Sequence, residues 1–390
     1  MTDVRIVGAG MTDFGVHDRP LAELFADAAV DALDDAACAP ADIDAFYLGN
    51  AMSGQTDGDT HLAPTLASHL GMAGIPCTRF EDACATSSNA FSHAVRAVAA
   101  GQYDTVLVGG VERCTPATGL GTDEMTAVFA SAAHRQYEQP TGLTFPGVFG
   151  LLTTRHMHEY GTTEEQLAAV AVKNHRHGTL NPRAQFGTET TVAEVLEGPV
   201  VASPFRLLDC CPFSDGAAAV VVTREDAVDD PESAPRVAGI GHATDAVPLA
   251  TKADLTATQS ARDAAAAAYA EADIQPADVD VAEVHDCFTG AEILAIEALG
   301  FVDTGEGGHA AVEGTTALGG EIPVNPSGGL KAKGHPIGAT GVAQLVELTD
   351  QLRGEAGERQ VPDARYALAH NLGGDAATTL VTVLDGGVSA

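Results

Sequence analysis

One cysteine, Cys84, stands where a thiol could act as a nucleophile. It lies in the run DACATSSNAF (residues 82–91) and is followed at once by small residues. Behind them, a helical pattern puts Phe91, Ala94 and Val98 on one face. This predicts a thiol in the first turn of a helix, where unpaired backbone N–H groups and the helix dipole stabilise a thiolate. The alternative is an inert core cysteine, since free cysteine is among the most buried residue types.

Three motifs in the second half of the chain carry residues suited to the same chemistry. The run VHDCF holds His285 and Cys287 just past an apolar strand, and loops at strand ends often carry function. A glycine-rich run, residues 325–341, surrounds His335, so its backbone can make unusual turns and approach a ligand closely. The third motif, AHNLGG at residues 369–374, again stands at a strand end.

Together these residues can make or break a carbon–carbon bond next to a thioester. Cys84 supplies a nucleophile that holds the acyl group, and His335 is the candidate base that forms its thiolate. Backbone N–H groups at Cys84 and in the last glycine loop, with the side chains of His285 and His335, are candidate donors to the oxyanions. A further acid/base must move a proton at Cα of the second acyl group.

The predicted helices and strands around these motifs indicate an internal duplication. Residues 40–44 (PADID) and 276–280 (PADVD) are near copies, and each follows an alanine-rich helical pattern. The Cys84 run and the His335 run also both read as loop, helix, strand and glycine pair, in the same order. The sequence therefore predicts two α/β halves.

The predicted boundaries divide the chain into three parts. The first half takes residues 1–115 plus 205–235, and the second takes residues 236–390. Between them lies a less regular insertion, residues 116–204, with a helix beginning near Glu164 and capped by Thr162 or Thr163.

A basic island stands out in this acidic chain. No acid occurs between residues 166 and 187, where Lys173, Arg176 and Arg183 gather. Such an island indicates an anion site, here for phosphate groups, to which we add Ser327 and Gly328 as candidate coenzyme A contacts. The alternative is an ordinary solvated helix end, where cations are favoured. The nearby histidine pairs are two residues apart and diverge on a helix, so no metal site is predicted.

The first strand ends in Gly8-Ala-Gly10, which invites comparison with a dinucleotide-binding loop. That fingerprint needs Gly-x-Gly-x-x-Gly running into a helix, whereas this chain continues as MTDFGVHD with no helical pattern. We therefore predict that these glycines bind no dinucleotide.

The net charge is extreme, with 54 acidic against 20 basic residues and a balance of −34. Dispersed acids repel nucleic acid and anionic membranes, and they are typical of a protein from a salt-loving organism. No run approaches the apolar length of a membrane helix, and the N-terminus lacks a signal-peptide pattern, so we expect a cytoplasmic protein. The seven cysteines form no Cys-x-x-Cys pair, and Cys210 and Cys211 are expected to pack.

In combination, the motifs of Cys84, VHDCF, GHPIGATG and HNLGG resemble the thiolase superfamily over essentially the whole chain. The resemblance is closest to the sterol-carrier-type thiolases and the archaeal acetyl-CoA acetyltransferases. It implies a five-layered αβαβα fold made from two halves with mixed sheets, with the insertion as a loop domain over the active site.

The resemblance also implies roles for single residues. Asn371, Gly373 and Gly374 would form the active-site loop beside His370. In many thiolases a cysteine at the position of His370 is the second acid/base; here that transfer fails. In sterol-carrier-type enzymes the cysteine of HDCF takes this role, so Cys287 is favoured over His370.

The activity implied is acetyl transfer between coenzyme A thioesters through an acyl-cysteine, in either direction, with no further cofactor. A homodimer or tetramer is expected, as is association with a small zinc-binding OB-fold protein. Two alternatives stay open: a condensing enzyme like 3-oxoacyl synthase or HMG-CoA synthase, and a non-catalytic acyl-CoA-binding scaffold subunit.

Overall fold

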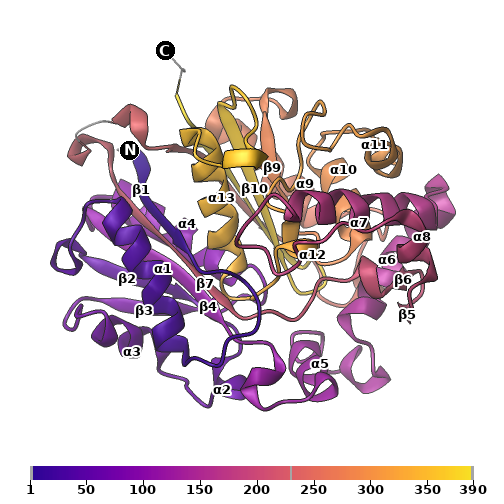
Figure 1. Cartoon of the computed structure of the whole chain (residues 1–390), viewed down its shortest axis with the longest axis horizontal. Helices are drawn as coiled ribbons and strands as arrows, with labels where there is room; N and C mark the ends of the chain where they lie inside the picture. The colour runs from indigo at the N-terminus through magenta and orange to yellow at the C-terminus, as the bar shows by residue number, and fades with distance from the viewer. Residues whose placement is uncertain (1–2, 229–230, 388–390) are drawn as a thin grey trace.

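The computed structural model describes residues 3–228 and 231–387 and shows an α/β fold (Figure 1). Its strands are β1 (Val4–Met11), β2 (Ala45–Gly49), β3 (Cys77–Phe80), β4 (Thr105–Glu112), β5 (Val200–Ala202), β6 (Phe205–Arg206), β7 (Gly216–Arg224), β8 (Arg236–Thr244), β9 (Val281–Glu283), β10 (Tyr366–Gly373) and β11 (Thr378–Asp385). Its α-helices are α1 (Leu21–Asp35), α2 (Ser53–Thr56), α3 (Leu62–His69), α4 (Thr86–Ala99), α5 (Thr122–Ala130), α6 (Phe145–Tyr160), α7 (Glu164–Gly178), α8 (Val192–Glu197), α9 (Gln259–Ala272), α10 (Thr289–Ala298), α11 (Gly307–Glu313), α12 (Gly329–Ala332) and α13 (Thr340–Arg353).

The main sheet has the strand order β3-β2-β4-β7-β1-β8-β11-β10-β9. Strands β1 and β8 meet only through the pair Arg5 and Arg236, so the sheet divides there into two half-sheets. Outward from that point the orders β1-β7-β4-β2 and β8-β11-β10-β9 match. In each, the last pair is parallel and the others are antiparallel. The predicted duplication and mixed sheets are therefore confirmed.

The repeated PADID and PADVD segments make the same backbone hydrogen bonds in both halves. The carboxylates of Asp42 and Asp278 each accept the backbone N–H three residues earlier, which closes the short helical turns η1 (Pro40–Asp42) and η8 (Pro276–Asp278). The carboxylates of Asp44 and Asp280 each accept two backbone N–H groups where the neighbouring strand, β4 or β10, begins. The repeated aspartates therefore satisfy backbone N–H groups at the same places in both halves.

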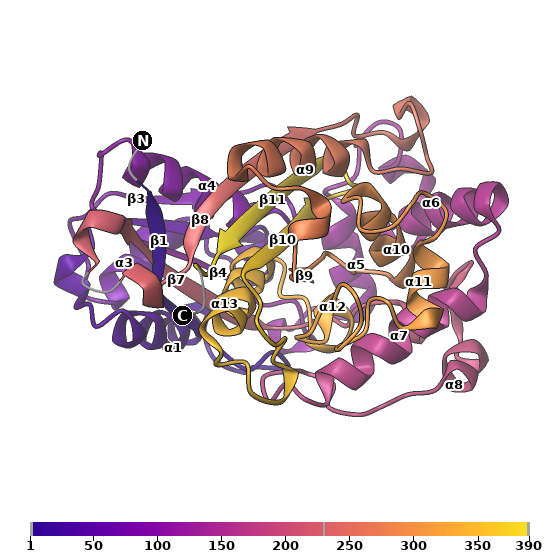
Figure 2. The ribbon, with the colours of Figure 1, turned by 90° about the horizontal axis from the view of Figure 1, so that it is seen from above.

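The packing gives five layers. Helices α4 and α13 lie between the half-sheets and share one apolar core with both (Figures 1 and 2). Helices α1 and α3 pack on the outer face of the first half-sheet, and α9 and α10 pack on the outer face of the second. The αβαβα arrangement implied by the resemblance is confirmed. This arrangement places the N-terminal ends of α4 and α13 at the same edge of the core.

The paired glycines of β1 serve this packing. A Cβ built on Gly10 would lie 2.3 Å from the carbonyl oxygen of Ala28 in α1. The second half repeats the device, since a Cβ on Gly241 in β8 would lie 1.7 Å from the carbonyl oxygen of Ala264 in α9. The matching GAG and GIG runs are a further trace of the duplication that the sequence analysis missed.

Replacing Gly10 by alanine is expected to lower the free energy of unfolding by about 1–3 kcal/mol, because a methyl group must push α1 off the sheet. Gly15→Ala is the matched control, since a Cβ there would meet nothing within 4 Å. Urea unfolding midpoints of the two variants and the wild type make the comparison. Equal midpoints for both variants would show that α1 moves away without cost.

The insertion forms α5, α6, α7 and α8 and packs against the second half. Helix α7 begins as predicted, with the hydroxyl of Thr163 accepting the Gln166 N–H at 3.3 Å. In α6, His156 forms a buried 3.0 Å contact from Nε2 to the carboxylate of Glu297 in α10. The insertion is thus joined to α10, the helix that follows the VHDCF motif.

Among the helices of the described residues, none has both the length and the apolar character needed to cross a bilayer.

Candidate active site

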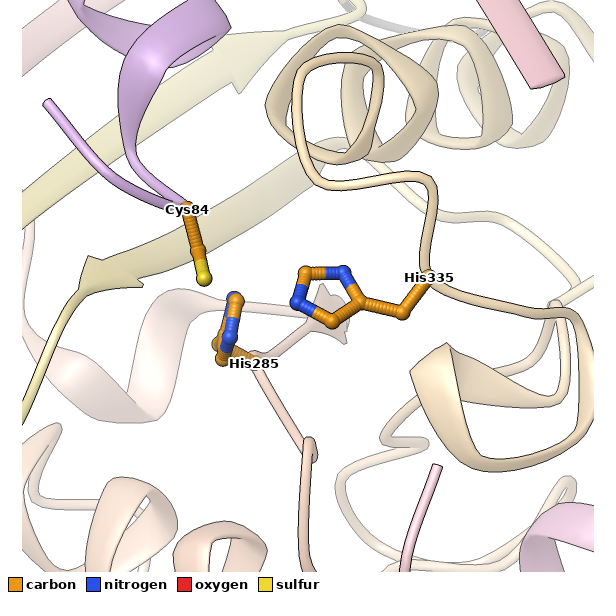
Figure 3. Close-up of side chains that lie close together, drawn as sticks. All are labelled: Cys84, His285 and His335. Carbon is orange, nitrogen blue, oxygen red and sulfur yellow. The ribbon is translucent and has the colours of Figure 1, made fainter. Parts of the chain in front are cut away.

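Three segments far apart in the chain bring one thiol and two imidazoles together. Cys84 stands between β3 and α4, His285 follows β9, and His335 precedes α13. The sulfur and one nitrogen of each imidazole all lie within 4.8 Å of one another, and Figure 3 shows the three side chains facing a common point. The first half of the chain therefore supplies the nucleophile, and the second half supplies both imidazoles.

A strained turn presents the thiol. Ala83 has φ of 47°, in the left-handed region that non-glycine residues seldom adopt. The hydroxyl of Thr86 clamps this turn, because it donates to the carbonyl of Ala83 at 2.5 Å and accepts the N–H of Asp82 at 2.8 Å. Cys84 is consequently held two residues before α4, just outside the first turn in which it was predicted, and retains partial exposure to solvent.

The expectation of a resting thiolate is wrong. Burial is the largest influence and raises the pKa of Cys84 to about 12, although the N–H of Gly374 bonds to the sulfur and opposes the rise. The carboxylates of Glu112 and Glu81 raise the pKa further. In this acidic interior the desolvation of the anion outweighs the field of the helix terminus. Cys84 rests as a thiol and needs a base to react.

His335 is held as such a base. Its Nδ1 lies 2.7 Å from the hydroxyl of Thr340, which itself donates to the carbonyl of Pro336 at 3.1 Å. That hydroxyl must therefore accept from Nδ1–H, and this network assigns a free lone pair to Nε2. Burial, then the charge of Lys333, lowers the pKa of His335 to about 3, so the ring is neutral near pH 7.

His285 is oriented by an amide. Its Nδ1 lies 2.9 Å from Oδ1 of Asn371, whose Nδ2 donates to the hydroxyl of Ser88 at 2.9 Å. Its Nε2 is buried with no hydrogen-bond partner, and its ring meets that of His335 edge-on with centroids 4.9 Å apart. Burial, then His335, then His370 keeps the pKa of His285 well below its ordinary value. The free nitrogen is available to a reacting group.

The resting thiol leads to a test by pH. Alkylation of Cys84 by iodoacetamide is expected to quicken about tenfold per pH unit from pH 7 to pH 10 without a plateau, because only the thiolate reacts and its fraction still grows below pH 12. A short unstructured peptide with one cysteine, whose thiol pKa is about 8.5, is the reference, and its alkylation rate levels off above about pH 9.5. Peptide mapping assigns the modified residue. A plateau for Cys84 near pH 7 would instead reveal a thiolate–imidazolium pair.

The amide of Asn371 is expected to matter for rate rather than for stability. Asn371→Ala frees the ring of His285, and a misplacement of about 1 Å costs about 100-fold in the rate of Cys84 acylation. KM for the thioester should change little. Asn89→Ala is the control, because that amide lies on α4 but bonds to Asp82 instead of an imidazole. Stopped-flow acylation rates measure the effect; equal rates for the two variants would rule out an orienting role for Asn371.

A further thiol accompanies Cys287. Cys287 is buried in an apolar cluster with Phe288 and Leu372, and burial, then Cys211, then Cys84 raises its pKa. The N–H of Cys211 donates to the carbonyl of Cys287 at 3.0 Å. Cys211 was expected only to pack, yet it lies beside the candidate second acid/base. The only signal in the sequence was that Cys211 lies in the loop just before the buried strand β7.

His370 faces differently from its neighbour. Successive side chains of a strand point to opposite faces, and on β10 it is Asn371 that reaches the ring of His285. The Nδ1 of His370 instead accepts the backbone N–H of His285 at 3.4 Å. Burial lowers the pKa of His370 to about 4. His370 therefore contacts the backbone behind the site.

The glycines of the last motif are placed at the thiol. The N–H of Gly374 bonds to the sulfur of Cys84, and a Cβ on Gly373 would lie 2.6 Å from the carbonyl oxygen of Asp82. The turn that carries the thiol and the end of β10 therefore touch, and only residues without a side chain allow this approach.

Two of the candidate coenzyme A contacts are buried in ion-pair or hydrogen-bond networks. Lys173 pairs with Glu292 at 3.0 Å and also donates to the carbonyl of Val324 at 2.9 Å. The hydroxyl of Ser327 donates to the carboxylate of Glu283 at 2.7 Å. The acids that neutralise the island come from distant segments, which sequence spacing cannot show. These polar groups stabilise the fold and leave no donor for a phosphate.

The other three candidates differ in exposure. Arg176 is exposed on α7. Arg183 is partly exposed and lies 3.5 Å from the carboxylate of Asp350. Gly328 is buried with φ of 96°, and a Cβ there would lie 2.8 Å from Gly178. Of the predicted contacts, only the two arginines can still meet a solvated anion.

Comparison with known proteins covers both halves. The family model described as "Thiolase, N-terminal domain" matches residues 4–226, and the one described as "Thiolase C-terminal domain-like" matches residues 241–386. The chain is 43% identical to an acetyl-CoA acetyltransferase of Methanothermobacter thermautotrophicus, covering 98% of this chain and 99% of the relative. It is 34% identical to sterol carrier protein 2 of Bos taurus, covering 95% of this chain and 70% of the relative.

Solved structures show the same fold. The structure titled "Ltp2-ChsH2(DUF35) aldolase" superposes with a TM-score of 0.82 at 25% identity, covering 97% of both chains. Human mitochondrial 3-ketoacyl-CoA thiolase superposes with a TM-score of 0.74 at 19% identity, covering 98% of both chains. The two matches span the insertion as well as both halves.

Proposed function

The chain belongs to the thiolase family, and from this membership we propose that it is an acetyl-CoA C-acetyltransferase. It would condense two molecules of acetyl-CoA to acetoacetyl-CoA and free coenzyme A, or cleave a 3-oxoacyl-CoA with coenzyme A in reverse. The observation that carries the proposal is the meeting of the Cys84 thiol with the imidazoles of His285 and His335. The relatedness to acetyl-CoA acetyltransferases supports the choice of substrate.

The first half-reaction follows from the resting protonation states. Nε2 of His335 takes the proton of the Cys84 thiol while the sulfur attacks the thioester carbonyl. The protonated ring of His335 can then donate to the oxyanion, as can backbone N–H groups of the Gly374 loop. Collapse of the tetrahedral intermediate breaks the bond to the coenzyme A sulfur, which leaves as a thiol with one proton. The acetyl group stays on Cys84.

The second half-reaction needs a base for Cα of the incoming acetyl group, and we propose Cys287. Its thiol can give its proton to the departing coenzyme A, so that it becomes the thiolate that removes the Cα proton. The carbanion attacks the acetyl-enzyme and the bond to the sulfur of Cys84 breaks. That sulfur takes back the proton held by His335, and acetoacetyl-CoA leaves. Electrostatic influence between Cys287 and Cys84 supports their proximity. No cofactor beyond the thioesters is needed.

Product analysis with acetyl-CoA as the sole substrate tests the proposal. Acetoacetyl-CoA and one equivalent of coenzyme A are expected, and acetoacetyl-CoA plus coenzyme A should return acetyl-CoA. A requirement for a malonyl thioester would favour a 3-oxoacyl synthase, and consumption of acetoacetyl-CoA with acetyl-CoA would favour an HMG-CoA synthase. Alkylation of Cys84 by iodoacetamide without protection by acetyl-CoA would favour a scaffold subunit.

We propose that the chain has three parts, which are residues 1–115 plus 205–235, residues 116–204 and residues 236–390. We propose that Arg176 and Arg183 contact coenzyme A. We propose a homodimer or tetramer in the cytoplasm of a salt-loving organism. We also propose a small zinc-binding OB-fold partner; the structural relative titled "Ltp2-ChsH2(DUF35) aldolase" supports association with a second protein.

A further inference from the structure

The acyl-binding centre has the donor set of a transition-metal site. One sulfur and two imidazole nitrogens lie within 4.8 Å of one another, and within residues 3–228 and 231–387 this is the one such group of three histidine, cysteine or acidic side chains. We propose that Cys84, His285 and His335 form an inhibitory site for a thiophilic divalent cation such as Zn²⁺. The proposal does not depend on which acyl group the protein transfers.

The outer hydrogen bonds favour metal binding. Ligating histidines usually donate their other ring N–H to an oxygen, which fixes the tautomer and the direction of the ring. Here Nδ1 of His285 is taken by Asn371 and Nδ1 of His335 by Thr340. Both free nitrogens are therefore Nε2, and that of His285 is fully buried with no partner of its own. An unpartnered nitrogen beside a thiol is a ready ligand.

The distances suit zinc after a small closure. Zn–S bonds of about 2.3 Å and Zn–N bonds of about 2.0–2.1 Å put tetrahedral donors about 3.3–3.6 Å apart. Because the donors of Cys84, His285 and His335 already lie within 4.8 Å, side-chain rotation of about 1 Å or less in most pairs completes the set. Three protein ligands leave the fourth position to water, as in catalytic zinc sites.

Binding and catalysis exclude each other because both use the same sulfur. Zn²⁺ forms a bond to the sulfur of Cys84, and the S–H proton passes to bulk water. Once the sulfur carries an acetyl group it is a thioester, which is a much poorer ligand than a thiolate. Zinc should therefore block acylation, and acetylation should block zinc.

Metal-stripped full-length protein, titrated with Zn²⁺ by calorimetry and with Co²⁺ by absorption, tests the site. One ion per chain is expected, and Co²⁺ should give a thiolate-to-metal charge-transfer band that disappears after treatment with acetyl-CoA. Cys84→Ala should weaken binding at least about tenfold and abolish the band. Cys38→Ser is the matched control, because this partly exposed thiol borders a groove that does not include the three proposed ligands. Its loss should leave zinc affinity and the cobalt band unchanged.

A second measurement needs no variant of the site. In the wild type, Zn²⁺ should protect Cys84 from iodoacetamide, as read by peptide mapping, while Cys38 stays reactive. Equal zinc affinity in Cys84→Ala, or unchanged alkylation of Cys84 under saturating zinc, would overturn the proposal. Apart from the displacement by acetyl-CoA, these measurements use no thioester. A negative result for metal binding therefore does not contradict acyl transfer, and a protein without acyl transfer can still be tested for metal binding.

Discussion

Replacing Cys84 by alanine abolishes the acetyl-enzyme and lowers turnover by about 10⁴- to 10⁶-fold, which is the expected loss for a covalent nucleophile. Intact-protein mass spectrometry after exposure to acetyl-CoA should show an acetyl adduct on the wild type and none on Cys84→Ala. Peptide mapping should place the adduct within residues 82–91.

The control for this variant addresses the other thiols near the site. Cys84 contributes to the raised pKa of both Cys211 and Cys287, so both thiols lie near the nucleophile and either is a competing site for the acetyl group. Cys211→Ala should still be acetylated at Cys84. An adduct that persists in Cys84→Ala, or that maps to Cys211 or Cys287, would show that the nucleophile has been misassigned.

The resting thiol makes this nucleophile dependent on its base. With the pKa of Cys84 near 12 and that of His335 near 3, moving a proton from one to the other is uphill before a substrate binds. Developing charge on the thioester oxygen, held by N–H groups, must compensate. The arrangement therefore protects the thiol from solution electrophiles near neutral pH and reserves its reactivity for a bound thioester.

The two-half architecture could be predicted from the sequence because the duplication is visible as short repeated segments. The PADID and PADVD copies keep aspartates with the same backbone partners in both halves, so the repeat in the sequence is a repeat in hydrogen bonding. Motif chemistry likewise predicted which thiol and imidazoles would meet. Each motif stands at the end of a strand or the start of a helix, where the fold carries such residues to one edge.

Long-range electrostatics could not be predicted in the same way. Lys173 looked free because its partner Glu292 lies more than a hundred residues away, and burial reversed the expected direction of the pKa of Cys84. Both errors have one cause: spacing along the chain shows neither which distant groups share an interior nor how much water is excluded from it. The orienting role of Asn371 and the place of Cys211 were missed for the same reason.

Replacing Cys287 by alanine separates the two half-reactions. Acetylation of Cys84 by acetyl-CoA should stay within a few-fold of the wild-type rate, whereas condensation should fall about 10²- to 10⁴-fold, the usual contribution of a general acid or base. Single-turnover acylation and steady-state formation of acetoacetyl-CoA measure the two steps separately.

His370→Ala is the matched variant, because His370 is the other candidate for the same role. Its ring lies behind His285, where it accepts a backbone N–H, so its removal should disturb both half-reactions to a similar and smaller extent. Condensation at the wild-type rate in Cys287→Ala would remove Cys287 from the mechanism. A loss confined to condensation in His370→Ala would transfer the role to that imidazole, and β10 would then have to present His370 to the substrate.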